Sequence, residues 1–539
     1  MFLRILLIVI FIAIAVAVGV FTRRAATNVD GFILGGRNVG PWLSAFAYGT
    51  AYFSAVVFIG YAGQFGWKYG MAATWIGLGN ALIGSLLAWW VLGPRTREVT
   101  QRLKASTMSE FFGKRYKSKG LRVSSAAIIF VFLIPYTASV YNGLSRLFNM
   151  AFGIPYEYCV IGMAVVTCIY VVLGGYMATV VNDFLQGIVM LFGIIAVICA
   201  VILNQGGLTE AVVSLSQIPG EGTAQLGVFT SFLGPDFFNL MGVVVLTSLG
   251  AWGLPQMVQK FYAIKSGPAI KQGAIISTFF ALVIAGGSYF LGGFGRLFTG
   301  SVELTANGTP VFDSIIPTML ANSNLPDILI GLLVVLVLSA SMSTLSSLVL
   351  TSSSVLTLDL VKGNIVKDMS ERKQIVWMRS LIVVFVVISA AIALFQYHSS
   401  VAWIAQLMGI SWGALAGSFL GPFLWGLYSK RVSKASVWVS FVLGVGITVS
   451  NLFIGFTNVI NAGALAMIVS IIIVPIVNIF TKAVPFEVNP PRPDSAMDRE
   501  IIATLQAEGI TSGTAEEGVK IADEASVADA IGGVDRPNA

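Results

Sequence analysis

Hydroxyl side chains are concentrated in one apolar stretch, residues 338–359, which reads LSASMSTLSSLVLTSSSVLTLD. A helix in hydrocarbon seldom carries so many Ser and Thr residues unless it holds something polar, because no water is present to satisfy them. Four residues recur at three- and four-residue spacing and so share one helical face: Ala340, Ser343, Thr344 and Ser347. Such a face offers hydroxyl and carbonyl oxygens, the hard ligands that suit alkali cations. The pattern therefore indicates a sodium ion beside this helix.

Two apolar segments, five spans apart, carry residues that interrupt a helix. The segment AFAYGTAYFSAVVFIG has Gly49, Thr50 and Ser54 at its centre, and VLTSLGAWGLPQMVQ contains Gly253 and Pro255. Proline removes a helical hydrogen bond, and glycine lowers the cost of unwinding. Paired broken helices are typical of a transporter site, where freed carbonyls bind cations and half-helix ends face the substrate. The alternative is a pair of kinked helices, with the hydroxyls serving helix packing alone.

A carboxylate, Asp183, lies near the start of another apolar segment, GGYMATVVNDFLQGIVM. A charge inside a membrane is costly, so its presence indicates a functional site. The alternative is a residue at a helix start outside the hydrocarbon, near Gly174 and Gly175, where it would complement the helix dipole. We favour the functional interpretation.

The composition predicts a polytopic membrane protein. Of 539 residues, 56% are hydrophobic and 11% charged, whereas soluble domains have about 25% charged residues. Apolar windows of about 20 residues, the length that crosses a bilayer, give thirteen candidate spans. These windows are 3–21, 40–64, 71–92, 123–150, 156–173, 180–203, 238–261, 274–297, 328–358, 376–396, 401–428, 435–454 and 459–480. An odd number of spans puts the two chain ends on opposite sides.

Lys and Arg residues gather on alternate connections, and such residues are retained on the cytoplasmic side. The connections after spans one, three, seven, nine and eleven hold most of them, with Lys260 counted after span seven, whereas segment 204–236 has acids and no cation. We therefore expect a multi-pass protein of the cell membrane with its N-terminus outside and its C-terminus in the cytoplasm. The net charge of +7 follows from this topology and from cationic loops facing anionic lipid. It does not indicate nucleic-acid binding.

Several other function classes find little support in the residues. The chain has one histidine and three cysteines without metal-ligand spacing, and its spans contain no nucleophile or acid pair, so we expect no enzyme. A sensor built on a transporter fold would need a signalling domain, for which the polar, acidic tail 481–539 is too small. A passive channel fits paired broken helices less well than a closed site does. The sensor and the channel are kept as alternatives to a transporter.

Five segments together resemble the sodium:solute symporter family, most like its proline and pantothenate branches. In chain order they are FILGGRNVGPW, AYFSAVVFIG, GGYMATVVNDFLQG, GLPQMVQKFYA and SMSTLSSLVLTSSSVLTLDL. The resemblance implies an all-α polytopic membrane protein of about thirteen transmembrane helices, with a LeuT-type core of two inverted five-helix repeats. The implied parts are an extra N-terminal helix at 1–22, repeats at 40–204 and 236–429, two further helices at 435–480, and a cytoplasmic, largely disordered tail at 481–539.

The resemblance also implies sodium ligands. The positions that match the family's main sodium site are the carbonyls of Thr50, Phe53 and Ala340 and the hydroxyls of Ser343 and Thr344. Some members of the family add a second sodium ion, held by an acid and nearby serines. The matching positions are Asp183, Ser343, Ser346 and Ser347.

The substrate is less well defined than the ion. The expected pocket wall consists of Tyr52, Ser54, Tyr136 and Trp252, which are aromatic or polar and uncharged. Proline-type members carry an aspartate where this chain has Tyr52, and the pantothenate-type pattern is more similar locally. A half-helix N-terminus can receive a carboxylate in place of Arg or Lys. Sugar and iodide transport also occur in the family.

The resulting prediction is a sodium-coupled symporter that imports a small organic solute by alternating access. The solute classes are an amino acid such as proline, pantothenate or another monocarboxylate. The expected partners are the solute, sodium ions and the lipid bilayer. No obligatory protein partner and no nucleic acid are indicated.

Overall fold

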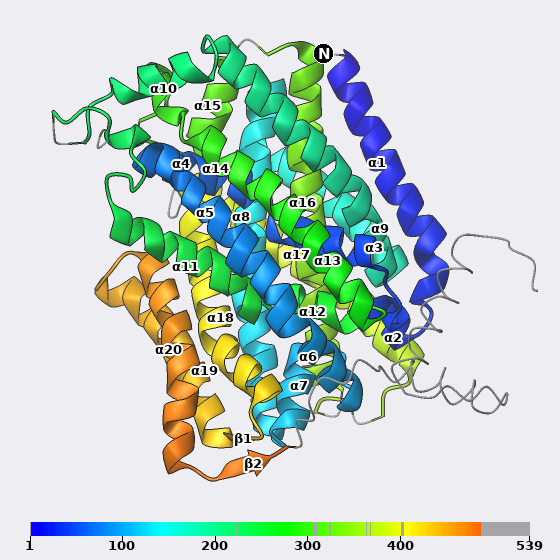
Figure 1. The fold of residues 1–539 in the computed structure, drawn as a ribbon. Helices are drawn as coiled ribbons and strands as arrows, with labels where there is room; N and C mark the ends of the chain where they lie inside the picture. The colour runs from blue at the N-terminus through cyan, green and yellow to red at the C-terminus, as the bar shows by residue number, and fades with distance from the viewer. Residues whose placement is uncertain are drawn as a thin grey trace, which may run out of the picture. The chain divides into compact units, whose positions relative to one another are not determined.

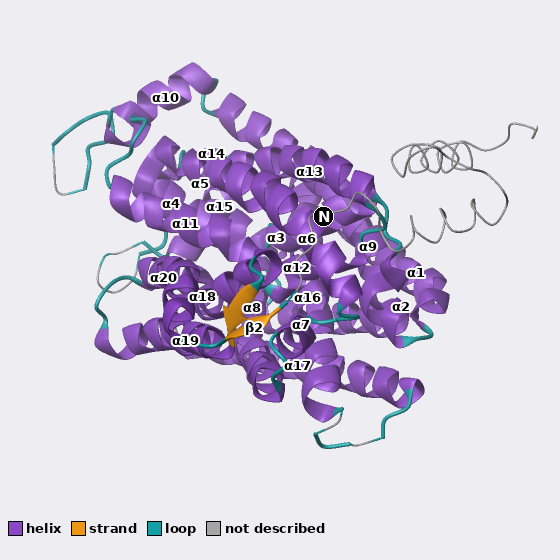
Figure 2. Ribbon diagram, turned by 60° about the horizontal axis from the view of Figure 1, so that its bottom comes forward, coloured by secondary structure: helices purple, strands orange, loops and turns teal. Residues whose placement is uncertain are grey.

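Helices account for most of the chain in the computed structural model, as the colouring of Figure 2 makes plain. The structure describes residues 2–486 apart from 222–223, 305–307, 309, 324, 363, 367 and 400–403. Residues 1–265 and 269–488 form one compact unit. The second unit comprises 266–268 and 489–539, and the tail within it lies outside the described residues, as does most of the predicted tail 481–539.

Figure 1 shows the α-helices, most of which are joined by short connections, with longer ones between α10 and α11 and between α14 and α15. They are α1 (Phe2–Thr22), α2 (Val29–Leu34), α3 (Pro41–Tyr52), α4 (Ala62–Tyr69), α5 (Thr74–Gly79), α6 (Ala88–Arg102), α7 (Met108–Arg115), α8 (Lys119–Phe152), α9 (Tyr156–Asn204), α10 (Leu208–Ser216), α11 (Phe237–Gly253), α12 (Pro255–Ala263), α13 (Gly267–Ala281), α14 (Gly287–Gly292), α15 (Ile315–Ala321), α16 (Asp327–Val355), α17 (Glu371–Ser399), α18 (Ile404–Tyr428), α19 (Lys434–Ile454) and α20 (Val459–Phe480). Four π-helical segments, Val56–Tyr61, Asn80–Leu87, Leu282–Gly286 and Leu356–Val361, adjoin them. A short antiparallel pair, β1 (Arg431–Ser433) and β2 (Ala483–Pro485), joins the end of α18 to the segment after α20.

Within the described residues, 10 helices are long and apolar enough to cross a membrane, or 11 if the bent pair α11 and α12 is one span. The predicted count of thirteen is not confirmed. Two continuous helical stretches are much longer than the others: Val56–Arg102, which runs from the first π-helical segment through α4, α5 and α6, has 47 residues, and Tyr156–Asn204, which is α9, has 49. At about 1.5 Å per residue, each is more than twice as long as a bilayer core is thick. Each contains a glycine with a positive φ, Gly70 at 59° and Gly175 at 56°. Each therefore includes parts of two predicted spans.

The two predicted helix breaks are confirmed. Helix α3 ends at Tyr52, and Phe53 is extended, with φ of −109° and ψ of 95°. Helices α11 and α12 are bent by 46° at Leu254, directly before Pro255. Proline cannot donate the hydrogen bond that would continue α11, so the chain leaves the helix there.

The hydroxyl-rich helix α16 is among the most enclosed elements. Of its apolar span, 78% is buried, against 11% for α1. Helix α16 packs against α8, α9 and α1, and it also contacts α3. Helices α19 and α20 pack on α18 at one flank, at the lower left of Figure 1, whereas α1 lies along α9 at the right. The core therefore surrounds the helices that carry the candidate ion ligands.

Glycines allow α4 and α14 to approach closely. A Cβ atom added at Gly66 would overlap the backbone of Gly292, and one added at Gly292 would overlap the carbonyl of Ala62. Membrane helices associate through such small-residue contacts, because burying apolar surface gains little where lipid is equally apolar. Gly66 is thus a position where packing requires glycine.

We predict that Gly66→Ala destabilises the protein. The added methyl group would force α4 and α14 apart, and overpacking of this kind costs about 1–3 kcal/mol. Thermal unfolding of the purified protein in detergent would show a lower midpoint. The matched control is Gly162→Ala in α9, since a Cβ there meets open space. Equal midpoints for the two variants would contradict the assigned contact.

Candidate ion and substrate site

Four of the predicted sodium ligands converge where α3 breaks against α16. The hydroxyls of Ser343 and Thr344 donate to the Thr50 carbonyl at 3.1 and 3.2 Å. Both also donate to the Ala340 carbonyl at 3.1 Å. All four residues are fully buried. A hydroxyl that donates to a carbonyl can rotate and present a lone pair to a cation instead. The group therefore offers two hydroxyl and two carbonyl oxygens in one place.

Phe53, the fifth predicted ligand, is the first residue beyond α3. Its N–H donates to the Gly49 carbonyl at 3.0 Å, as in a helix, but its own backbone is extended. The next turn starts from Ser54, whose carbonyl accepts from Val57 N–H at 2.9 Å and whose hydroxyl accepts from Val56 N–H at 3.1 Å. The carbonyl of Phe53 thus belongs to the interrupted part of the backbone.

Two of the residues predicted for a second ion, Asp183 and Ser347, contact a lysine. The Lys260 ammonium lies 3.6 Å from a carboxylate oxygen of Asp183 and donates to the Ser347 hydroxyl at 3.1 Å. Lys260 and Asp183 are 2% and 0% exposed as side chains, so the pair is inside the protein. The Ser346 hydroxyl donates to the Ser343 carbonyl at 2.9 Å. The second-ion assignment remains a prediction.

Lys260 does not lie where the sequence predicts it. The prediction places it among the cations of a cytoplasmic connection, but it lies buried within α12. The signal that could have distinguished it is its place six residues from the helix break at Leu254, inside an amphipathic half-helix. Charge counting alone cannot separate a loop cation from a buried one.

Three of the four predicted substrate residues gather around a tryptophan that was not predicted. The ring of Trp412, in α18, has its centroid 6.0 Å from that of Tyr52 and 5.8 Å from that of Tyr136. The Tyr136 hydroxyl lies beside Ser54 and Trp412. Neither that hydroxyl nor the Trp412 indole N–H makes a hydrogen bond of normal geometry to any residue in the described part of the chain. The Tyr136 hydroxyl, the Ser54 side chain and the Trp412 indole thus form a polar cluster in which the contacts are loose.

Trp252, the fourth predicted substrate residue, is held separately. Its indole N–H donates to the Ile83 carbonyl at 3.0 Å. Tyr52 is also tied to α11, because its hydroxyl donates to the Thr247 carbonyl at 2.7 Å. The first broken helix is thus linked to the second by a direct hydrogen bond.

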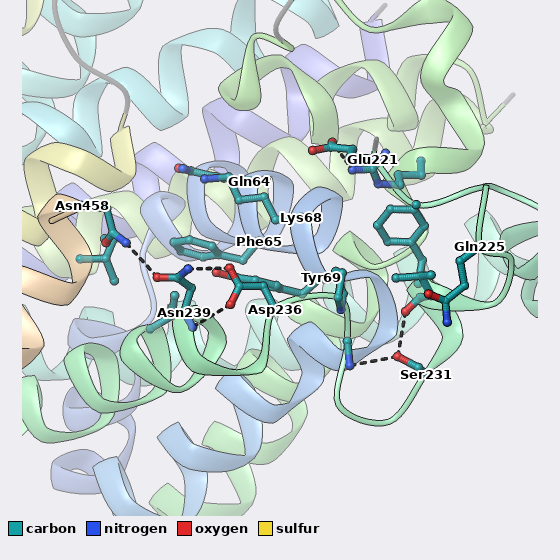
Figure 3. Close-up of a pocket in the computed structure, with 18 of the residues that line it drawn as sticks. Gln64, Phe65, Lys68, Tyr69, Glu221, Gln225, Ser231, Asp236, Asn239 and Asn458 are labelled. Carbon is teal, nitrogen blue, oxygen red and sulfur yellow. Dashed lines mark hydrogen bonds and ion pairs between the residues drawn. The ribbon is translucent and has the colours of Figure 1, made fainter. Parts of the chain in front are cut away.

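A polar cavity of about 650 Å³ lies beside the start of α11 (Figure 3). Asn239 stands in its wall, bonded to Asp236 at 2.5 Å and to Asn458 at 3.0 Å. The wall also includes Val243, whose carbonyl accepts the Thr247 hydroxyl at 2.9 Å. One helical turn therefore separates the cavity from the residue that binds Tyr52.

The other end of the site is tightly closed. The space between Thr107, Gln259 and Thr351 is about 10 Å³, which is about the size of a single water molecule. The Thr351 hydroxyl donates to Gln259 at 2.8 Å, and Asp359 accepts from Thr107 and Arg122, both at 2.6 Å. A cavity thus lies one helical turn from Thr247, and polar contacts leave little space around Gln259 and Thr351.

Comparisons with known proteins agree with this geometry. Residues 32–444, more than half of the chain, match the model of the sodium:solute symporter family. A sodium/proline symporter of Staphylococcus aureus (strain JH9) is 28% identical over 448 residues, which cover 81% of this chain and 84% of that protein. The structure of a substrate-bound, outward-open sodium-coupled sialic acid symporter has a TM-score of 0.75 at 18% identity, covering 90% of this chain and 99% of that one. This likeness confirms the predicted all-α, LeuT-type membrane fold.

We predict that Tyr52→Phe lowers the thermal midpoint of the protein without solute. The change removes the hydrogen bond to Thr247, and such a bond contributes about 1 kcal/mol. A suitable control is Tyr61→Phe, because the Tyr61 hydroxyl makes only a 3.4 Å contact with the Ala405 carbonyl. If Tyr52→Phe unfolds at the unaltered midpoint, the bond between the two broken helices does not stabilise this conformation.

Proposed function

The chain belongs to the sodium:solute symporter family, and we propose that it imports a small organic solute with sodium bound between α3 and α16. The protein is therefore a transporter, not an enzyme. The observation that carries the proposed ion site is the convergence of the Ser343 and Thr344 hydroxyls on the Thr50 carbonyl at the α3 break. Sodium ligands are Thr50, Phe53 and Ala340 through their carbonyls, together with the two hydroxyls.

Sodium binding joins two elements that otherwise meet through weak hydrogen bonds. The two hydroxyls rotate away from the carbonyls and turn their lone pairs to the ion. The ion, bound by carbonyls and hydroxyls together, holds the broken end of α3 against α16. This favours the conformation in which the cavity is open. Residues 40–204 and 236–429, as inverted repeats, then rock to open the other end. The membrane potential contributes about 2.3 kcal/mol per charge for every 100 mV.

The solute occupies the region of Tyr52, Ser54, Tyr136 and Trp412. The Tyr136 hydroxyl and the Trp412 N–H, which lie beside each other, meet its polar groups, and the N-terminus of α12 receives a carboxylate. Trp252 supports this wall through its bond to Ile83. Proline is the first candidate because curated relatives at 28% identity are named sodium/proline symporters. Pantothenate and other monocarboxylates follow, since Tyr52 replaces the aspartate of the proline pattern.

The cavity faces the outside of the cell in this proposal. The segment 204–236, which contributes Glu221 and Asp236 to the cavity wall, carries no Lys or Arg. Arg122 donates to Asp359 at the closed end, and Arg97 and Arg115 donate to carbonyls just beyond the ends of α12 and α18, as expected for the cytoplasmic side. The N-terminus is therefore outside and the C-terminus inside.

Uptake into proteoliposomes tests the function. With an inward sodium gradient, we expect labelled proline to accumulate above its external concentration, and replacement of sodium by potassium to abolish accumulation. Pantothenate and a monocarboxylate are assayed in parallel. Sodium-independent equilibration of every solute would indicate a channel and would contradict the proposal.

Removal of either hydroxyl should raise the sodium requirement. Because a bond from a polar group to a charge contributes about 1.5–3 kcal/mol, we expect Ser343→Ala and Thr344→Ala each to raise the half-saturating sodium concentration at least about tenfold. The matched control is Ser341→Ala on the same helix, since the Ser341 hydroxyl donates only to the Val337 carbonyl at 2.8 Å. Unchanged sodium dependence in both test variants would remove the site.

A further inference from the structure

A buried ammonium group stands among the residues that resemble a second sodium site. Lys260 contacts the Asp183 carboxylate at 3.6 Å and the Ser347 hydroxyl at 3.1 Å, and its nitrogen lies 5.2 Å from the centre of the Tyr176 ring. These are an anion, a hydroxyl oxygen and an aromatic face, all of which attract cations. Lys260 therefore makes the contacts that a bound cation would make.

An added sodium ion would be repelled in the same place. Two unit positive charges about 4 Å apart, at an effective dielectric constant of about 20, repel strongly enough to weaken binding roughly a thousandfold. The Asp183 carboxylate can attract an ion only to the extent that Lys260 leaves its charge uncompensated. Both side chains are almost completely buried, so water does little to screen the repulsion.

We propose that the Lys260 ammonium permanently takes the place of a second sodium ion, so that the protein binds one sodium ion per transport cycle. The proposal rests on the proposed function, because it concerns the ion stoichiometry of the same transporter. It replaces the two-ion alternative with a single ion at Thr50, Ser343 and Thr344.

The position of Lys260 in the fold gives this substitution a mechanical consequence. Lys260 belongs to α12, the half-helix that follows the break at Leu254, whereas Asp183 belongs to α9 and Ser347 to α16. The lysine therefore ties the second broken helix to two of the helices around the ion site. A sodium ion in this position would bind and leave in each cycle, but the tethered ammonium stays and carries no charge across the membrane.

Binding of labelled sodium to the purified full-length protein, without solute, tests the proposal. Six proteins are compared: the unaltered chain, Lys260→Ala, Asp183→Asn, Ser343→Ala, Lys260→Ala combined with Asp183→Asn, and Lys271→Ala as a control that removes an exposed cation. We expect one equivalent of sodium in the unaltered chain and in Lys271→Ala. Lys260→Ala should bind two equivalents, because the freed carboxylate attracts an ion. The double variant should return to one.

Two results would overturn the proposal: two equivalents in the unaltered chain, with one lost in Asp183→Asn, or a single equivalent in folded Lys260→Ala. The first of these does not depend on any lysine variant. If Lys260→Ala does not fold because Asp183 is left without a partner, the count in the unaltered chain and in Asp183→Asn still decides the question. Failure of the proposed function gives a different pattern, because sodium binding would then be absent or unaffected by Ser343→Ala.

Discussion

The structure depends on how a helix can be interrupted inside a membrane without leaving its backbone unsatisfied. Hydrocarbon offers no partner to a free carbonyl, and each such group costs several kcal/mol. At the end of α3 the partners come from Ser343 and Thr344, which donate to the Thr50 carbonyl. Side-chain hydroxyls are exchangeable partners, unlike the N–H groups of a continuous helix. The break therefore has hydrogen-bond partners without an ion, and the same hydroxyls would coordinate the sodium ion that we propose, which is the property that a coupling site requires.

The second broken helix is held by a different interaction. Its half-helix α12 carries Lys260, which is paired with Asp183 at 3.6 Å inside the protein. Breaking a buried pair by removing one partner typically costs about 3–5 kcal/mol, because the other charge is left without compensation. The two breaks thus differ in kind. One is closed by neutral hydroxyls that can turn from the carbonyls toward a bound ion, and the other by a covalently attached charge.

Much of this arrangement could be predicted from the sequence, because the physical signals are local. Spacing alone placed Ser343 and Thr344 on one helical face, and Gly and Pro marked the breaks at Phe53 and Leu254. Two features could not be obtained from the sequence, because they depend on tertiary contacts or on bends. Trp412 carries no sequence mark that separates it from other membrane tryptophans, and its role follows from packing against Tyr52 and Tyr136. The count of thirteen spans stays unconfirmed, because the two long helices that bend at Gly70 and Gly175 are each continuous, and each includes parts of two predicted spans.

The most direct test of the account is hydrogen exchange of the backbone amides around the α3 break, compared in sodium and in potassium. If sodium joins the carbonyls at the break to α16, the amides of residues 50–57 exchange more slowly in sodium, and those of the lipid-facing helix α1 do not change. Identical exchange of residues 50–57 in the two salts would contradict the claim that the break is the coupling site.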